Sequence, residues 1–100
     1  MTKKIAYLVV HIEDIEREAK TDNNAKIVLE YIKKMISSVA KEDLFLMPKR
    51  QDPRKPPIEQ LKSYDKVYVY GAYHGMCLNS TCITLTMHGI RNELDSKGII

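Results

Sequence analysis

The chain has no hydrophobic run long enough to cross a membrane, because a membrane-spanning helix needs about 20 predominantly apolar residues in succession. The longest apolar run begins at Ile5 and is interrupted at His11. Only Lys3 and Lys4 precede it as basic residues, and acidic residues instead of a small-residue cleavage site follow it. We therefore interpret this run as a buried strand and not as a secretory signal. These absences predict a cytoplasmic protein with no membrane partner.

A strong excess of charge of one sign is also missing, since the net charge is +3. The densest basic stretch, residues 49–55, contains no aromatic residue on which nucleic-acid bases could stack. We interpret it as a solvated loop and expect no nucleic-acid partner. The two cysteines, Cys77 and Cys82, match neither a disulfide framework nor a redox pair, so both are expected to be thiols.

Apolar patterns of strand type and helix type alternate along the chain. Strands are predicted near residues 4–11, 43–47 and 66–71, and a long apolar stripe predicts a helix over residues 27–39. A short helix is expected after Pro57, and the charged stretch 13–22 is interpreted as a connection or a frayed first helical turn. The alternation predicts one α/β domain over residues 1–100: a three-layer α/β/α sandwich, Rossmann-like, with a small and mainly parallel sheet.

Residues 80–88 are ambiguous. Ile83, Leu85 and Met87 alternate with polar residues, and this period of two favours a strand. A helix here would instead continue the strand–helix alternation, with Gly89 as its C-terminal stop. Periodicity alone leaves both possibilities open.

In a parallel sheet, ligands bind beyond the carboxyl ends of the strands. Residues 11–14, 49–55 and 71–77 follow the three predicted strands and would meet there. A cysteine at a helix N-terminus beside cationic groups is favoured as the reactive thiolate, which makes Cys77 a candidate nucleophile. Gly71 and Gly75 would let the backbone approach a substrate closely. The alternative is that Cys77 is a small buried apolar residue.

The segment from Gly71 to Gly89 resembles the signature of the isochorismatase-like cysteine hydrolases. A strand ends in glycine, and a cysteine preceded by methionine follows six residues later. Thr81 comes four residues after Cys77, and Gly89 comes eight after Thr81. The match covers about twenty-five residues, including the strand from Lys66. The resemblance implies a short and divergent member of that family, because the family domain is longer.

The resemblance also implies a fold and a site. It implies a helix over residues 77–88 and a cis peptide bond between Tyr73 and His74. The family reaction uses a cysteine nucleophile, a carboxylate at the end of the first strand and a lysine from the middle of the chain. Cys77 and Lys49 occupy the first and last of these positions, whereas His11 stands where the carboxylate is expected. The catalytic residues implied are thus Cys77, His11 and Lys49, with Glu13 and Asp14 as alternative bases; the substrate-binding residues implied are Gly71, Tyr73, His74, Gly75 and Met76.

The expected function is hydrolysis of a small amide or related small molecule, weak or absent because of His11, by a homo-oligomer, most simply a dimer, without cofactor or metal. Two other functions remain open. A zinc site could use His74, Cys77, Cys82 and His88, although this spacing is not that of a zinc finger or ribbon. A non-catalytic binding or interaction module could retain the fold without the chemistry.

Overall fold

The computed structural model describes residues 4–100. Its sheet has four parallel strands in the order β2-β1-β3-β4. The strands are β1 (Ile5–Val10), β2 (Leu44–Met47), β3 (Lys66–Gly71) and β4 (Asn92–Ile99). The helices are α1 (Ile12–Glu18), α2 (Asn23–Ser38), α3 (Ile58–Leu61) and α4 (Cys77–Met87), with a 3-10 turn, η1, at Lys41–Asp43. The expected α/β fold with a small parallel sheet is confirmed.

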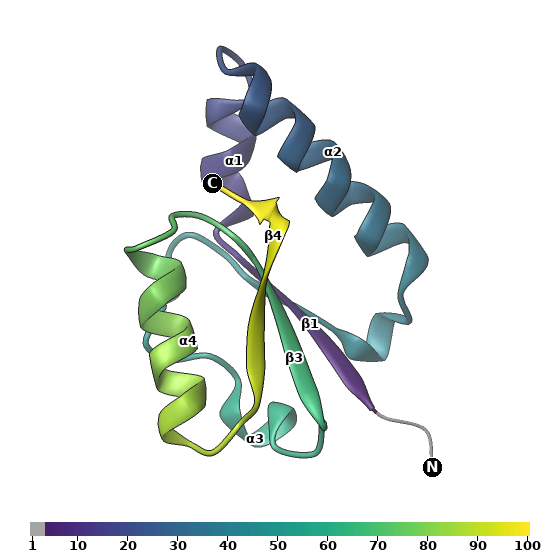
Figure 1. Ribbon diagram of the computed structural model, residues 1–100, viewed down its shortest axis with the longest axis vertical. Helices are drawn as coiled ribbons and strands as arrows, with labels where there is room; N and C mark the ends of the chain where they lie inside the picture. The colour runs from purple at the N-terminus through teal and green to yellow at the C-terminus, as the bar shows by residue number, and fades with distance from the viewer. Residues whose placement is uncertain (1–3) are drawn as a thin grey trace.

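Side chains that alternate along each strand form two apolar layers. Ala6 and Leu8 face the side of α3 and α4, where they pack in a core that includes Leu61 and Leu85. Val9 packs on the opposite side with Ile32 of α2. Figure 1 shows α1 and α2 on one side of the sheet and α3 and α4 on the other. The sandwich therefore has three layers.

The ends of β1 and β3 approach each other closely at Gly71. Val10 pairs with Gly71 in the register of the two strands, and the Ala72 amide donates to the Val10 carbonyl over 3.1 Å. A Cβ added to Gly71 would lie 1.9 Å from the Val10 carbonyl oxygen, and the φ angle of Gly71 is 125°. Only glycine fits this position, which brings the loops after the two strands side by side.

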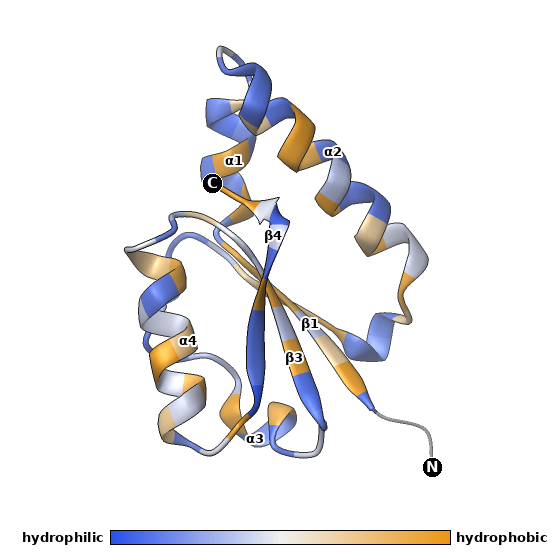
Figure 2. Cartoon of the chain, viewed as in Figure 1, coloured by the Kyte–Doolittle hydropathy of each residue, from blue (hydrophilic) through white to orange (hydrophobic). Residues whose placement is uncertain are grey.

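The sequence prediction omitted β4. Its residues are mostly polar, as the blue colour of β4 in Figure 2 shows, and the strand lies at the edge of the sheet. An irregular segment separates the pairs Val69–Leu94 and Gly71–Ile99. Here Asp95 accepts hydrogen bonds from the Tyr31 hydroxyl and the Lys97 amide. An edge strand with a bulge needs no continuous apolar alternation, so periodicity did not reveal it.

Two other predictions are settled by the structure. Residues 12–18 form a helix and not a connection, because Ile15 packs in the α1/α2 layer beneath an otherwise charged surface. Residues 77–87 are helical, so the period of two did not indicate a strand. Leu78 and Leu85 are buried on the sheet side of α4, and Gly89 follows the helix with a φ of 73°.

Among residues 4–100, no helix combines the length and the apolar character that crossing a membrane requires.

Candidate functional site

A buried carboxylate lies at the carboxyl edge of the sheet, on α1. Asp14 occupies the first turn of this helix, and its side chain is 3% exposed. One carboxylate oxygen is paired with the Lys49 ammonium and lies 3.0 Å from Nη2 of Arg17. Burying a carboxylate is costly unless cations or donors compensate it, and these two groups supply that compensation. Asp14 is thus held in place from two different segments.

Sequence analysis placed His11 first as the base. The His11 ring is buried, and its Nε2 lies 3.0 Å from the Gln51 carbonyl oxygen. Nδ1 is 4.0 Å from Oδ2 of Asp14. Because the Gln51 backbone carbonyl can only accept a hydrogen bond, Nε2 carries the proton and donates to it. The His11 ring thereby holds the loop after β2 in place. His11 therefore lies near Oδ2 of Asp14, whereas Lys49 is paired with Oδ1, and Asp14 is the group that contacts the lysine.

Glu13, the other alternative base, contacts the backbone of Lys49 and not its ammonium. Its side chain is exposed, and both carboxylate oxygens accept from the Lys49 backbone amide, over 3.1 and 3.2 Å. This contact anchors the backbone of Lys49, while the Lys49 side chain reaches Asp14. Glu13 and Asp14, two of the four acidic residues of α1, thus bind the same lysine at different atoms.

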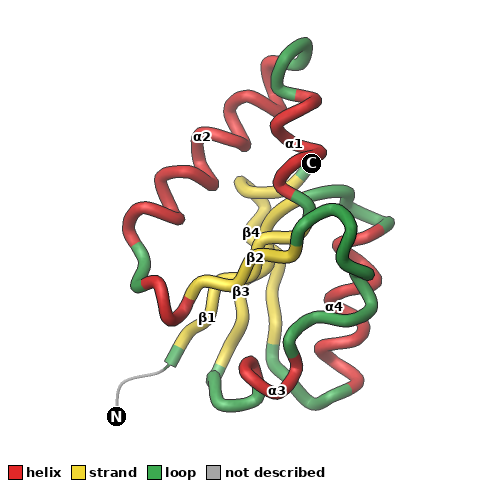
Figure 3. Tube along the Cα trace, turned by 180° about the vertical axis from the view of Figure 1, so that it is seen from behind, coloured by secondary structure: helices red, strands yellow, loops and turns green. Residues whose placement is uncertain are grey.

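The loop over residues 48–57 contains Lys49 and forms a hydrogen bond with α4, the helix that begins at Cys77. The Thr81 hydroxyl donates to the Pro53 carbonyl over 2.6 Å, and it also lies 3.1 Å from the Cys77 carbonyl. Figure 3 shows this loop running beside α4. Thr81 therefore joins the loop that contains Lys49 to the first turn of α4. In the sequence, Thr81 was noted only for its spacing in the family signature.

The segment between β3 and α4 carries the expected substrate-binding residues. His74, Gly75 and Met76 are exposed, and the Met76 and Leu78 amides both donate to the Tyr73 carbonyl. The cis peptide bond joins Ala72 to Tyr73, one residue before the position that the resemblance implied. The Tyr73 hydroxyl accepts from Nη2 of Arg17 over 2.9 Å.

Cys77 is the first residue of α4 and is half-buried. Among the hydrogen bonds of the described residues, none takes its backbone amide and none joins its thiol to Asp14 or Lys49. Part of the side chain packs against the core on the α4 side of the sheet. Cys82 lies one and a half turns further on, and burial raises the pKa of its thiol above the ordinary value.

The structure thus brings Asp14, Lys49 and His11 into one cluster. Among residues 4–100, the hydrogen bonds that connect Cys77 to this cluster run through the loops of Pro53 and Tyr73. The sequence prediction missed Arg17, which binds both Asp14 and Tyr73. Its spacing of three residues from Asp14 on a helix could have indicated the ion pair, had residues 13–22 been predicted as helical.

A metal site finds no support within residues 4–100, where no three histidine, cysteine or acidic side chains are grouped as ligands. Comparisons of the chain with protein-family models, curated proteins and solved structures give no match.

Proposed function

We propose that this protein is a cysteine hydrolase of the isochorismatase-like type, acting on a small amide or a related small molecule. The observation that carries the proposal is the pair of Asp14 and Lys49 beyond the ends of β1 and β2, which Arg17 joins to Tyr73 in the loop that leads from β3 into Cys77. A thiol, a carboxylate and an ammonium from these three segments are the groups that the reaction requires.

In the proposed reaction, Asp14 accepts the thiol proton of Cys77. The thiolate attacks the carbonyl carbon of the substrate, the carbon–nitrogen bond breaks, and the proton passes from Asp14 to the leaving amine. Water then attacks the carbonyl carbon of the thioester while one of its protons goes to Asp14; the carbon–sulfur bond breaks, the carboxylic acid leaves, and the Cys77 thiolate takes the proton back from Asp14, which restores the thiol and the carboxylate. Lys49 orients the carboxylate throughout, and His11 positions the loop of Lys49 without a direct part in proton transfer.

The first turn of α4 offers a donor for the negative oxygen of the tetrahedral intermediate. The Cys77 amide has no acceptor among the described residues, and α4 has no side-chain cap at its N-terminus. Unpaired amides at a helix start stabilise an anion through hydrogen bonding and the helix dipole.

The proposal is tested by incubating the protein with a panel of small amides and measuring released ammonia or amine. Any turnover should disappear in Cys77→Ser and persist in the matched variant Cys82→Ser. Mass spectrometry of the quenched wild-type reaction should find an acyl adduct on Cys77. Turnover that survives Cys77→Ser would refute the cysteine mechanism.

The second candidate function is a non-catalytic binding module. The contact between part of the Cys77 side chain and the apolar core favours it, because a thiol that serves as packing needs no activation. A protein without turnover whose Cys77 is also inert towards alkylating reagents would have this function. We further propose a cytoplasmic homodimer that needs no cofactor.

A further inference from the structure

We propose that Arg17 binds an anionic group of the substrate, so that the site takes small molecules carrying a carboxylate or a similar anion. The inference rests on the proposed function, because it assigns a substrate class to the same site. It arises from the position of one guanidinium, which joins the buried carboxylate on α1 to the loop before Cys77.

Two contacts fix the orientation of Arg17. Its Nη2 lies 3.0 Å from Oδ1 of Asp14 and 2.9 Å from the Tyr73 hydroxyl oxygen. Holding a long side chain in one geometry normally costs conformational entropy, and here this cost is met before any ligand arrives. The guanidinium is therefore preorganised at the rim of the site.

The same guanidinium remains open to a ligand. The side chain is 56% exposed, although Asp14 beneath it is 3% exposed. Arginine has five N–H donors, and the contacts with Asp14 and Tyr73 both use Nη2. Among the described residues, nothing accepts from Nε or Nη1. Three donors thus remain for an anion that enters beside Tyr73.

The charges around Arg17 have both signs. Two cations, Lys49 and Arg17, contact the single buried carboxylate of Asp14. Glu13, Glu16 and Glu18 lie on the same helix and retain their negative charges, but among residues 4–100 none of them forms an ion pair with Arg17. The binding of an anion at the rim therefore depends on the open donors of Arg17 and not on an excess of positive charge.

Two alkylating reagents of nearly equal size test this inference on the intact chain. Iodoacetate carries a carboxylate and iodoacetamide is neutral, and both label Cys77, which follows Tyr73 by four residues. We expect the ratio of the iodoacetate rate to the iodoacetamide rate at Cys77 to fall about fivefold in Arg17→Gln at low salt. The difference should shrink at ~0.5 M salt, because ions screen exposed charges.

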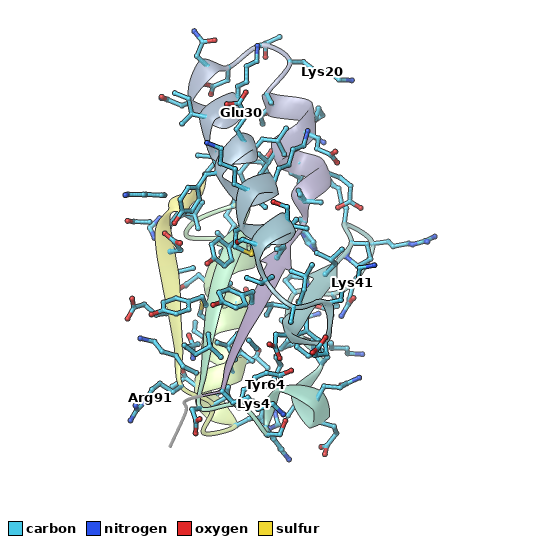
Figure 4. The ribbon with its side chains drawn as sticks, turned by 90° about the vertical axis from the view of Figure 1, so that its right-hand side faces the viewer. Lys4, Lys20, Glu30, Lys41, Tyr64 and Arg91 are labelled. Carbon is cyan, nitrogen blue, oxygen red and sulfur yellow. The ribbon has the colours of Figure 1, made fainter. Side chains whose placement is uncertain are left out.

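Three variants serve as controls. Arg91→Gln removes the same charge from the end of the molecule opposite Lys20, as Figure 4 shows, and should leave the ratio unchanged. Arg17→Lys retains the charge and should retain most of the preference. Tyr73→Phe removes only the hydroxyl that orients Arg17 and should give an intermediate ratio. A ratio that is the same in the wild type and Arg17→Gln, or that falls equally in Arg91→Gln, would overturn the inference.

The experiment separates this inference from the proposed function. The absolute iodoacetamide rate at Cys77 reports the reactivity of the thiol, whereas the ratio of the two reagents reports the anion site. A Cys77 that reacts only slowly with iodoacetamide, but whose ratio still depends on Arg17, would refute the hydrolase and leave an anion-binding site. A reactive Cys77 whose ratio is independent of Arg17 would refute only the substrate class.

Discussion

The carboxylate of Asp14 is paired with the ammonium of Lys49, although 35 positions separate the two residues in the chain. Asp14 follows β1 and Lys49 follows β2, and these strands are neighbours in the parallel register of Leu8 with Phe45. The pairing of the strands therefore brings the two charges together. This pair, and not His11, defines the centre of the candidate site.

The first prediction concerns the identity of the base. For any amide that the protein hydrolyses, Asp14→Asn should lower kcat by about 10²–10⁴-fold, the usual contribution of a positioned acid–base group. His11→Asn should have a much smaller effect, because His11 contacts the Gln51 carbonyl and lies 4.0 Å from Asp14. Circular dichroism of both variants serves as the folding control. The reverse order of effects would make His11 the base.

The second prediction concerns the contact between the ends of β1 and β3. Gly71→Ala should lower the free energy of unfolding by about 3 kcal/mol, since a Cβ there would overlap the Val10 carbonyl. Gly75→Ala is the matched control: Gly75 also has a positive φ, of 82°, but a Cβ would meet nothing within 4 Å. Its loss should be about 1 kcal/mol. Chemical denaturation measures both, and equal losses would contradict the close approach.

The third prediction concerns alkaline pH. Burial, with the nearby Asp95 carboxylate, raises the pKa of Tyr70 well above its ordinary value of 10.0. The folded state therefore keeps this phenol neutral at a pH where the unfolded chain ionises it. The stabilising effect is complete below pH 10 and is lost as the pH rises further. Between about pH 9 and 11, the free energy of unfolding should fall less steeply with pH in Tyr70→Phe than in the wild type. The same slope in both proteins would contradict a raised pKa of Tyr70.

The fourth prediction concerns self-association. Ile83 and Met87 lie four residues apart on α4 and are 52% and 80% exposed. Burial of such residues between subunits would enlarge the small core of a 100-residue chain. Light scattering at high micromolar concentration should give twice the monomer mass of 11.5 kDa, and Ile83→Glu should shift it towards the monomer. A monomeric wild type under these conditions would refute the dimer.

The sequence predicted the parts of this fold that apolar periodicity encodes. The apolar side chains of the buried strands and of α2 made these elements predictable. Helix α1 and strand β4 were not predicted, because a helix with one buried apolar residue, Ile15, and a polar edge strand with a bulge carry little such signal. Helix α4 was implied by the resemblance of the stretch from Gly71 to Gly89 to the family signature, whereas propensity favoured a strand.

The candidate site was predicted only in part, for a similar reason. Sequence order placed His11 directly after the first strand, and this position suggested the base. In the structure His11 has a φ of 53°, and α1 begins immediately after it. The chain therefore turns at His11, and Asp14, three residues later, takes the buried position beside Lys49. The contacts of Arg17 depend on the same turn and could not be anticipated without α1.

The most direct test of the central claim is the relative alkylation of the two cysteines by iodoacetamide at neutral pH, followed by peptide mass spectrometry. Cys77 begins α4 directly after the loop of Tyr73, whereas burial raises the pKa of the Cys82 thiol. The account predicts that Cys77 is labelled at least about tenfold faster than Cys82. Equal labelling, or faster labelling of Cys82, would contradict the assignment of Cys77 as a nucleophile.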